Sequence, residues 1–261
     1  LVREGSLALS DDAGLREMRD WITNKRTFDL QPGGRVEKRD VLMTYAQHVR
    51  RFVDESKVRR FKIIMDAANG MAGAVAPPVF GGLPLECVEL HFKPDGSFPN
   101  HEPNPLLEVN RRQIVTMVHR ESADLGIAWD GDADRCFFID DQGKFVPGDF
   151  ITALLGEAFL VNEPGSSIVY DVRASWAVRD IVLANGGKPL INRVGHSFFK
   201  KRMREEGAIF GGEVSGHYYF RDNDYADNGM IPALLILELM STTKKKLSEL
   251  LAPLREKYFI S

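Results

Sequence analysis

Cysteine is scarce in this sequence, with two residues among 261, Cys87 and Cys136. A fold held together by several disulfide bonds is therefore excluded, and two thiols fit a reducing compartment. The longest apolar stretch, residues 233–240, contains Glu238 and is too short to span a bilayer. No charged-then-apolar signal pattern opens the chain. These absences predict a soluble, cytoplasmic protein that does not enter a membrane.

A large excess of charge of one sign is also missing. The 34 basic and 37 acidic residues give a net charge of −3, so composition supplies no electrostatic reason to expect a nucleic-acid partner. Two local basic runs, at residues 111–112 and 244–246, are interpreted as solvated helix ends. The length is sufficient for one large domain or two ordinary ones.

From Val36 onward, apolar segments of strand length alternate with segments of helical spacing. Strands are expected at residues 61–65, 85–91, 123–129, 167–172, 188–194 and 208–212, with a hairpin over residues 136–146. Helices are expected at residues 41–55, 74–80, 106–120, 150–160, 176–185, 198–206 and 230–240, with Ser175 as an N-cap. Such alternation indicates parallel sheets with right-handed crossovers. We therefore predict an α/β fold made of two consecutive α/β/α domains with mainly parallel sheets.

The two predicted domains repeat one order of elements, and a polar motif follows the third strand of each. Their expected bounds are residues 36–146 and 147–261. The first 35 residues differ, with one short helix at residues 15–21 and a linker composition, Gln-Pro-Gly-Gly, at residues 31–34. We interpret residues 1–35 as the tail of a preceding domain plus a linker.

The most informative motif is the run Asp-Gly-Asp-Ala-Asp-Arg at residues 130–135, directly after an apolar strand. Three carboxylates at alternate positions repel one another, so the motif calls for a cation. Oxygen-only ligands favour Mg²⁺, Mn²⁺ or Ca²⁺ over zinc. Arg135 beside such an ion matches the geometry of a phosphate oxygen pair. The motif thus indicates phosphoryl chemistry.

Three other interpretations fit this run less well. An EF-hand loop needs Gly at its sixth position and Glu at its twelfth, where this sequence has Arg135 and Asp141. A phosphatase of the haloacid-dehalogenase type would use Asp130 as nucleophile and Asp132 as acid, although no matching lysine-plus-carboxylate set stands out downstream. A solvated acidic turn is the least specific alternative.

Three more motifs are expected at strand ends, where parallel sheets bind ligands. In residues 211–217, Glu213, Ser215 and His217 alternate, and together they offer the hydrogen-bonding groups that a sugar needs. The run Gly-His-Ser at residues 195–197 opens a helix, where backbone N–H groups favour an anion. Arg173 follows a strand, where its charge could meet a phosphate.

Together these motifs resemble the α-D-phosphohexomutase superfamily, in its phosphomannomutase/phosphoglucomutase branch. The likeness extends over about residues 36–240 and is strongest at residues 130–135 and 212–217, with further family-like segments at residues 66–73, 95–105 and 195–197. Arg173 departs from the common family pattern, and Val214 distinguishes the chain from one branch. Arg173 stands where relatives often have Lys, and Val214 stands where the phosphoglucosamine branch typically has Gln.

The resemblance implies a role for each motif. Asp130, Asp132 and Asp134 would hold Mg²⁺, in a metal-binding first domain followed by a sugar-binding second domain. The implied catalytic residues are Arg135, His196 and His217. The implied substrate-binding residues are Arg173, Gly195, Glu213, Ser215 and His217. The implied reaction interconverts hexose 1-phosphate and hexose 6-phosphate through a phosphoserine and a hexose 1,6-bisphosphate intermediate.

Two parts that the family uses have no counterpart in the sequence. These are the Thr-Ala-Ser-His-Asn-Pro-like loop with the phosphoryl-carrying serine and the Arg-Pro-Ser-Gly-Thr-like loop that binds substrate phosphate. We therefore expect the chain to be the middle two of four domains and to be inactive by itself. The alternatives are the dehalogenase-type phosphatase and a non-catalytic sugar-phosphate-binding module.

Overall fold

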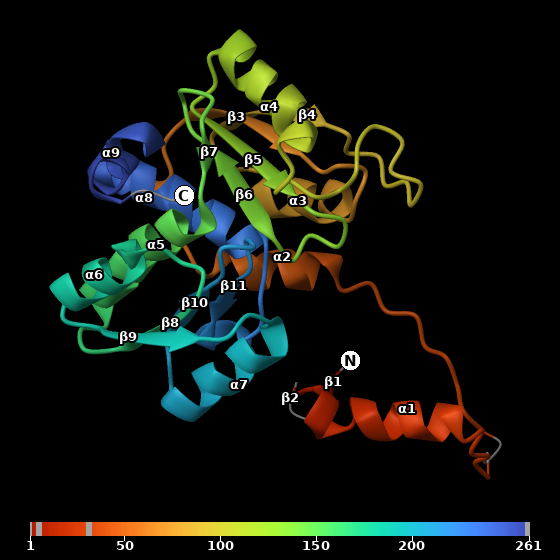
Figure 1. The fold of residues 1–261 in the computed structure, drawn as a ribbon. Coiled ribbons are helices and arrows are strands. Elements are labelled where there is room, and N and C mark those ends of the chain that lie inside the picture. The colour runs from red at the N-terminus through yellow and green to blue at the C-terminus, as the bar shows by residue number, and fades with distance from the viewer. Residues whose placement is uncertain (1, 4–6, 30–32, 259–261) are drawn as a thin grey trace.

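The computed structural model describes residues 2–3, 7–29 and 33–258, and it contains two separate mixed sheets flanked by helices (Figure 1). Gln31 and Pro32 of the expected linker lie outside the described residues. The two sheets and their helices confirm the predicted α/β class and its two α/β/α units. No helix in the described ranges is both long enough and apolar enough to cross a membrane.

The first sheet has the strand order β4-β3-β5-β6-β7. Its strands are β3 (Phe61–Asp66), β4 (Leu85–Leu90), β5 (Leu125–Trp129), β6 (Cys136–Ile139) and β7 (Phe145–Val146). Strand β3 pairs in parallel with β4 and β5, whereas β6 and β7 form the predicted antiparallel hairpin. The carboxyl ends of β3, β4 and β5 therefore meet at one edge of the sheet.

Helices cover both faces of this sheet. They are α2 (Leu42–Arg50), α3 (Ala72–Phe80) and α4 (Glu108–Glu121). Because side chains alternate along a strand, Ile63 packs in the apolar cluster that includes α3, and Ile64 packs against Ile114 and Val118 of α4. Alternate side chains of β3 thus face helices on opposite sides of the sheet, and the unit has a helix layer, a sheet and a second helix layer.

The second sheet has the order β11-β10-β8-β9. Its strands are β8 (Ser167–Asp171), β9 (Lys188–Asn192), β10 (Phe210–Gly212) and β11 (Tyr218–Phe220). Its helices are α5 (Gly148–Asn162), α6 (Trp176–Ala184) and α7 (His196–Glu206). Ile168 packs in the cluster shared with α5 and α6, while Val169 packs against Phe199 of α7. Strand β8 is parallel to β9 and β10, and the short β11 is antiparallel.

Two C-terminal helices join the units. Helix α8 (Met230–Thr243) contacts α2, α5 and β6, and one apolar cluster runs through both units around it. Helix α9 (Leu247–Lys257) docks on the turn of the β6–β7 hairpin, where Arg255 Nη1 donates to buried Asp140 Oδ2 at 2.5 Å. The two sheets are therefore held in one packed body.

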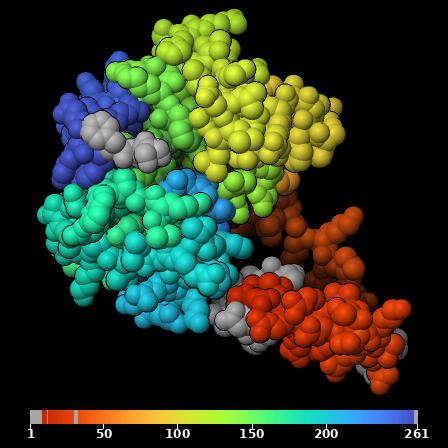
Figure 2. Space-filling model, viewed as in Figure 1, coloured from red at the N-terminus to blue at the C-terminus, as the bar shows by residue number. Residues whose placement is uncertain are grey.

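The N-terminal segment projects from this body, as Figure 2 shows in red, and its residues 7–8 contact α7. It contains β1 (Val2–Arg3), β2 (Leu7–Ala8), the 3₁₀ turn η2 (Asp11–Ala13) and α1 (Leu15–Thr23). Helix α1 buries none of its described side chains. The predicted short helix is confirmed.

Several predicted elements differ in length from the observed ones. The helix expected over residues 41–55 ends at Arg50, because Asp54 then accepts from Ser56 N and opens the 3₁₀ turn η3 (Glu55–Lys57). Ser175 is the N-cap of α6 as predicted, with Oγ accepting from Ala177 N at 3.3 Å. Strand β11, the 3₁₀ turn η4 (Arg221–Asn223) and helix α9 were not predicted.

Candidate active site

The acidic run lies in the loop that leaves β5 at the carboxyl edge of the first sheet. Asp130 is 2% exposed, and its two oxygens accept from Arg135, Oδ1 from the backbone N at 3.1 Å and Oδ2 from Nε at 2.7 Å. Ala133 has a φ of 63°, which lets the loop turn back on itself. One carboxylate oxygen from each of Asp130, Asp132 and Asp134 lies within 4.8 Å of the others.

Two of the three carboxylates in this loop, Asp130 and Asp134, are poorly solvated. Burial raises the pKa of Asp130 to about 6, with the Asp134 charge adding to the increase and Arg135 opposing it. Burial also works against ionised Asp134, but the hydrogen bond and charge of His217 outweigh it and lower the pKa of Asp134. A divalent cation would relieve the repulsion among these carboxylates. The three-oxygen donor set, with Asp132 open to solvent, therefore fits Mg²⁺.

The geometry is unfavourable for Asp130 as a nucleophile. A nucleophilic carboxylate needs an oxygen that faces the substrate, whereas both oxygens of Asp130 are engaged by Arg135 inside the loop. Asp132 is the exposed carboxylate of the three, and it faces a cavity of about 480 Å³ that is also lined by Tyr45 and Met71. This geometry disfavours the phosphatase alternative, because that alternative needs Asp130 as its nucleophile.

Two glycines allow other segments to approach the acidic loop closely. A Cβ on Gly70 would lie 2.6 Å from Gly131 O, and a Cβ on Gly229 would lie 2.5 Å from Ala133 O. Trp129 Nε1 also donates to Gly229 O at 2.8 Å. The loop is thus held between the exit of β3 and the start of α8.

We expect Gly229→Ala to lower the free energy of unfolding by about 1–3 kcal/mol, the usual range for overpacking a filled site. The added methyl group meets backbone and Trp129, neither of which can move freely. Mg²⁺ affinity should fall as well, because Ala133 belongs to the acidic loop. Denaturant unfolding and calorimetry with Mg²⁺ measure the two effects.

Gly96→Ala is the matched control, since nothing lies within 4 Å of a Cβ at that position. Its free energy of unfolding should change by less than about 0.5 kcal/mol. If Gly229→Ala and wild type had equal free energies of unfolding, a methyl group at residue 229 would fit beside the backbone of Ala133.

The loop after β10 faces the acidic loop across a backbone bridge between Arg135 and His217. Glu213 is 1% exposed, and it accepts from Gly195 N at 3.0 Å and from the Tyr219 hydroxyl at 2.6 Å. Burial and the Glu213 charge raise the pKa of Tyr219, so the hydroxyl stays a donor. The sequence predicted that the start of α7 favours an anion. In the structure the Glu213 carboxylate occupies that position.

His217 connects the two loops. Its Nε2 lies 3.5 Å from Asp134 Oδ1, and its Nδ1 lies 3.4 Å from Glu213 Oε2 and 3.2 Å from Ser215 Oγ. Burial opposes the charged imidazole, but Asp134 and Glu213 outweigh it and raise the pKa of His217. The ring of His196 stacks beside it at 6.4 Å between centroids. Predicted site residues from the acidic run, from residues 195–197 and from residues 211–217 thus lie together.

Arg173 is positioned by a residue that the sequence analysis missed. Asp171, fully buried at the end of β8, accepts from Arg173 Nη2 and from Val214 N, both at 2.8 Å. The hydrogen bond to Asp171 raises the pKa of Arg173, so the guanidinium stays charged. Asp171 therefore links Arg173 to the loop that carries Glu213. Its position at a strand end was the signal that could have found it.

Lys200 and Asp227 were also missed. Lys200 on α7 lies 2.6 Å from Asp227, whose carboxylate falls in a cluster with Asp134 and His217. These two residues are 27 positions apart, so their pairing depends on the packing of α7 and has no local sequence signal.

Comparison with known proteins gives a consistent result for both units. The family model of phosphoglucomutase/phosphomannomutase alpha/beta/alpha domain II matches residues 43–143, and that of domain III matches residues 147–258. A phosphomannomutase of Vibrio cholerae is 44% identical over 246 residues, which are 92% of this chain and 53% of that protein. The chain spans about half the length of the curated relatives it matches.

Solved structures show the same fold. The crystal structure of a phosphoglucomutase/phosphomannomutase family protein from Burkholderia thailandensis has a TM-score of 0.85 and 32% identity, covering 93% of this chain and 52% of that one. The N-acetylphosphoglucosamine mutase of Aspergillus fumigatus, in complex with GlcNAc-6P and magnesium, shares the fold at a TM-score of 0.59 and 16% identity, over 84% of this chain and 52% of that one. The chain belongs to the phosphoglucomutase/phosphomannomutase family of α-D-phosphohexomutases, in which it matches the middle domains II and III.

Proposed function

We propose that the parent protein interconverts hexose 1-phosphate and hexose 6-phosphate, with mannose and glucose phosphates as substrates. The observation that carries the proposal is the meeting of the acidic loop at residues 130–135 with the Glu213–His217 loop across the Arg135–His217 bridge. One loop suits a hard cation and a phosphoryl group, and the other offers sugar-binding groups. A hexose phosphate requires both at one place.

In this proposal Asp130, Asp132 and Asp134 hold Mg²⁺, which supplies positive charge next to the transferring phosphoryl group. Asp130 also orients Arg135 through the bond at 2.7 Å. The remaining guanidinium nitrogens of Arg135 are then free to contact phosphate oxygens, where a fixed positive charge lowers the barrier to phosphoryl transfer.

The sugar side is assigned to the second unit. Ser215 and Glu213 bind sugar hydroxyls, and Arg173 binds phosphate. Gly195 supports Glu213 through its backbone N–H. His196 and His217 line the site, and His217 also ties Asp134 to Glu213. This division makes residues 36–146 the metal-binding domain and residues 147–261 the sugar-binding domain.

The phosphoryl carrier in this proposal is a serine of a preceding domain, phosphorylated in the active enzyme, and the intermediate is a hexose 1,6-bisphosphate. The 261-residue chain has no Thr-Ala-Ser-His-Asn-Pro-like run. We therefore assign phosphoryl transfer to the longer protein, in the cytoplasm, and assign to this chain the binding of Mg²⁺ and sugar phosphate.

We expect the 261-residue chain to bind Mg²⁺ but not to isomerise mannose 1-phosphate, even with glucose 1,6-bisphosphate present. The reason is that the chain has no Thr-Ala-Ser-His-Asn-Pro-like run to supply the serine that passes the phosphoryl group between O1 and O6. A coupled assay for mannose 6-phosphate checks this, with the longer protein as the positive control. Sustained turnover by the purified 261-residue chain would contradict the serine-dependent mechanism.

A further inference from the structure

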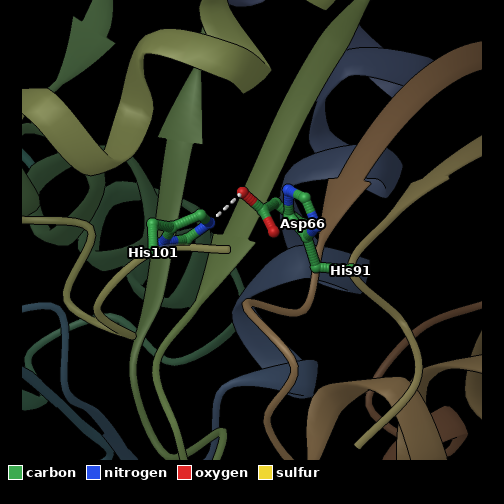
Figure 3. Close-up of side chains that lie close together, drawn as sticks. All are labelled: Asp66, His91 and His101. Carbon is green, nitrogen blue, oxygen red and sulfur yellow. Dashed lines mark hydrogen bonds and ion pairs between the residues drawn. The ribbon is translucent and has the colours of Figure 1, made fainter. Parts of the chain in front are cut away.

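A second group of metal-ligating side chains lies at the same sheet edge as the acidic loop but outside the proposed reaction. Asp66 ends β3 and His91 directly follows β4, so parallel pairing brings them side by side. His101 reaches them from the loop after β4, as Figure 3 shows. One ligand atom from each of these residues lies within 4.8 Å of the others.

The two ring nitrogens of His101 lie beside two different oxygens, one on Glu102 and one on Asp66. His101 Nδ1 lies 2.9 Å from the carbonyl oxygen of Glu102, so Nδ1 must carry a proton to bond there. In the neutral ring Nε2 is then unprotonated, and it lies 3.0 Å from Asp66 Oδ2. That contact needs a positive charge at Nε2, which either a metal ion or a second ring proton supplies, and the hydrogen bond to Asp66 raises the pKa of His101.

In His91 one ring nitrogen lies beside an oxygen outside the cluster. Its Nε2 lies 2.9 Å from Gln113 Oε1, and donation there leaves Nδ1 as the nitrogen with a lone pair. A backbone or amide oxygen that holds the second ring nitrogen is typical of metal-binding histidines. His91 also has a φ of 54°, an uncommon conformation for a side-chain-bearing residue that is found at ligand-holding positions.

We propose that Asp66, His91 and His101 bind a divalent ion of the zinc class, separate from the Mg²⁺ of the acidic loop. Two imidazoles and one carboxylate are donors that Zn²⁺ and Co²⁺ accept in tetrahedral sites with three protein ligands, the fourth position being open to water. Ligands about 2.0 Å from a tetrahedral ion lie roughly 3.3 Å apart, close to the 3.0 Å between His101 and Asp66. Mg²⁺ favours oxygen donors and should not compete here.

The ion would hold the loop after β4, which carries His101, against the ends of β3 and β4. This loop packs on the acidic loop. Asn100 Nδ2 in this segment donates to Asn69 Oδ1 at 2.7 Å, and a Cβ on Gly131 would contact the Phe98 ring at 3.4 Å. Because the ion would join β3, β4 and this loop only in the folded chain, it should raise the melting temperature.

Visible absorption of Co²⁺ tests the site, since tetrahedral Co²⁺ with nitrogen ligands absorbs far more strongly than hydrated Co²⁺. The 261-residue chain is titrated with Co²⁺ in excess Mg²⁺, which fills the acidic loop. We expect one strongly absorbing ion per chain, displaced by Zn²⁺, and a higher melting temperature with Zn²⁺.

His91→Asn is the informative variant, because Asn tolerates a positive φ and the substitution removes the imidazole. Its Co²⁺ affinity should fall by more than the roughly 10- to 100-fold that loss of an outer-shell partner causes. Asp66→Asn, which keeps an acceptor for Ala68 N, should lose the absorption as well. His119→Gln, at an exposed histidine on α4, is the control and should bind like wild type.

Two results would overturn the proposal. Absence of strong absorption from the folded wild-type chain would mean that Asp66 and His101 form an ordinary hydrogen-bonded pair. Unchanged absorption in His91→Asn would place the ion elsewhere, for example at Asp134, His217 and Asp227.

Discussion

Asp132→Asn is expected to weaken Mg²⁺ binding by about 100-fold or more while leaving the free energy of unfolding within about 0.5 kcal/mol of wild type. Loss of an outer-shell partner of a metal already reduces affinity by roughly 10- to 100-fold, and a direct ligand should matter at least as much. Asp132 is exposed, so its substitution removes little packing. Calorimetric titration with Mg²⁺ and denaturant unfolding measure the two quantities.

Asp130→Asn would give a less clear result. Asp130 is buried and bonds Arg135 twice, so the change also weakens a charge-assisted pair inside the loop. Glu157→Gln is the charge-matched control for Asp132→Asn, because it removes one exposed carboxylate on α5, outside the loop. If Asp132→Asn and Glu157→Gln bound Mg²⁺ equally well, the acidic run would be a solvated turn.

The complete enzyme is expected to discriminate strongly at C4 of the sugar and weakly at C2. If Glu213 and Ser215 bind O3 and O4, glucose and mannose phosphates should react at comparable rates, since they differ only at C2. Galactose 1-phosphate inverts O4 and leaves a polar group in the closed site without its partner. Such a loss costs about 1–3 kcal/mol, or roughly 5- to 150-fold in kcat/KM.

Ser215→Ala is the cleaner variant for this assignment. Glu213 also holds Gly195 and the buried Tyr219 hydroxyl, so its removal would disturb the loop itself. Ser215 contacts His217 and is half-buried. The substitution should lower kcat/KM for the glucose and mannose phosphates alike. Equal kcat/KM for galactose 1-phosphate and mannose 1-phosphate would remove the sugar-binding assignment but not the metal loop.

The predicted elements that the structure confirms, and the predicted closeness of the three carboxylates, have signals that are local in the chain. The run at residues 130–135 brings its carboxylates together because they are neighbours in one turn, and Ser175 caps α6 through a bond two residues away. The apolar β5 was recognisable because it is buried along its whole length.

The parts that were missed depend on long-range packing. Helix α9 follows the basic run at residues 244–246, which was interpreted as a solvated end, and it is fixed by Arg255 reaching Asp140. Asp171 links Arg173 to the Glu213–His217 loop by accepting a hydrogen bond from Val214 N, 43 residues away. No short window of sequence contains both members of these pairs, so spacing alone could not show them.

The most direct test of the phosphohexomutase proposal is ³¹P NMR of mannose 1-phosphate incubated with the longer parent protein, Mg²⁺ and glucose 1,6-bisphosphate. We expect the signal of the 1-phosphate to be replaced by that of a hexose 6-phosphate, with total sugar phosphate conserved. The conversion should be lost in Asp132→Asn. Growth of an inorganic phosphate signal in place of the 6-phosphate would contradict the mutase account and favour a phosphatase.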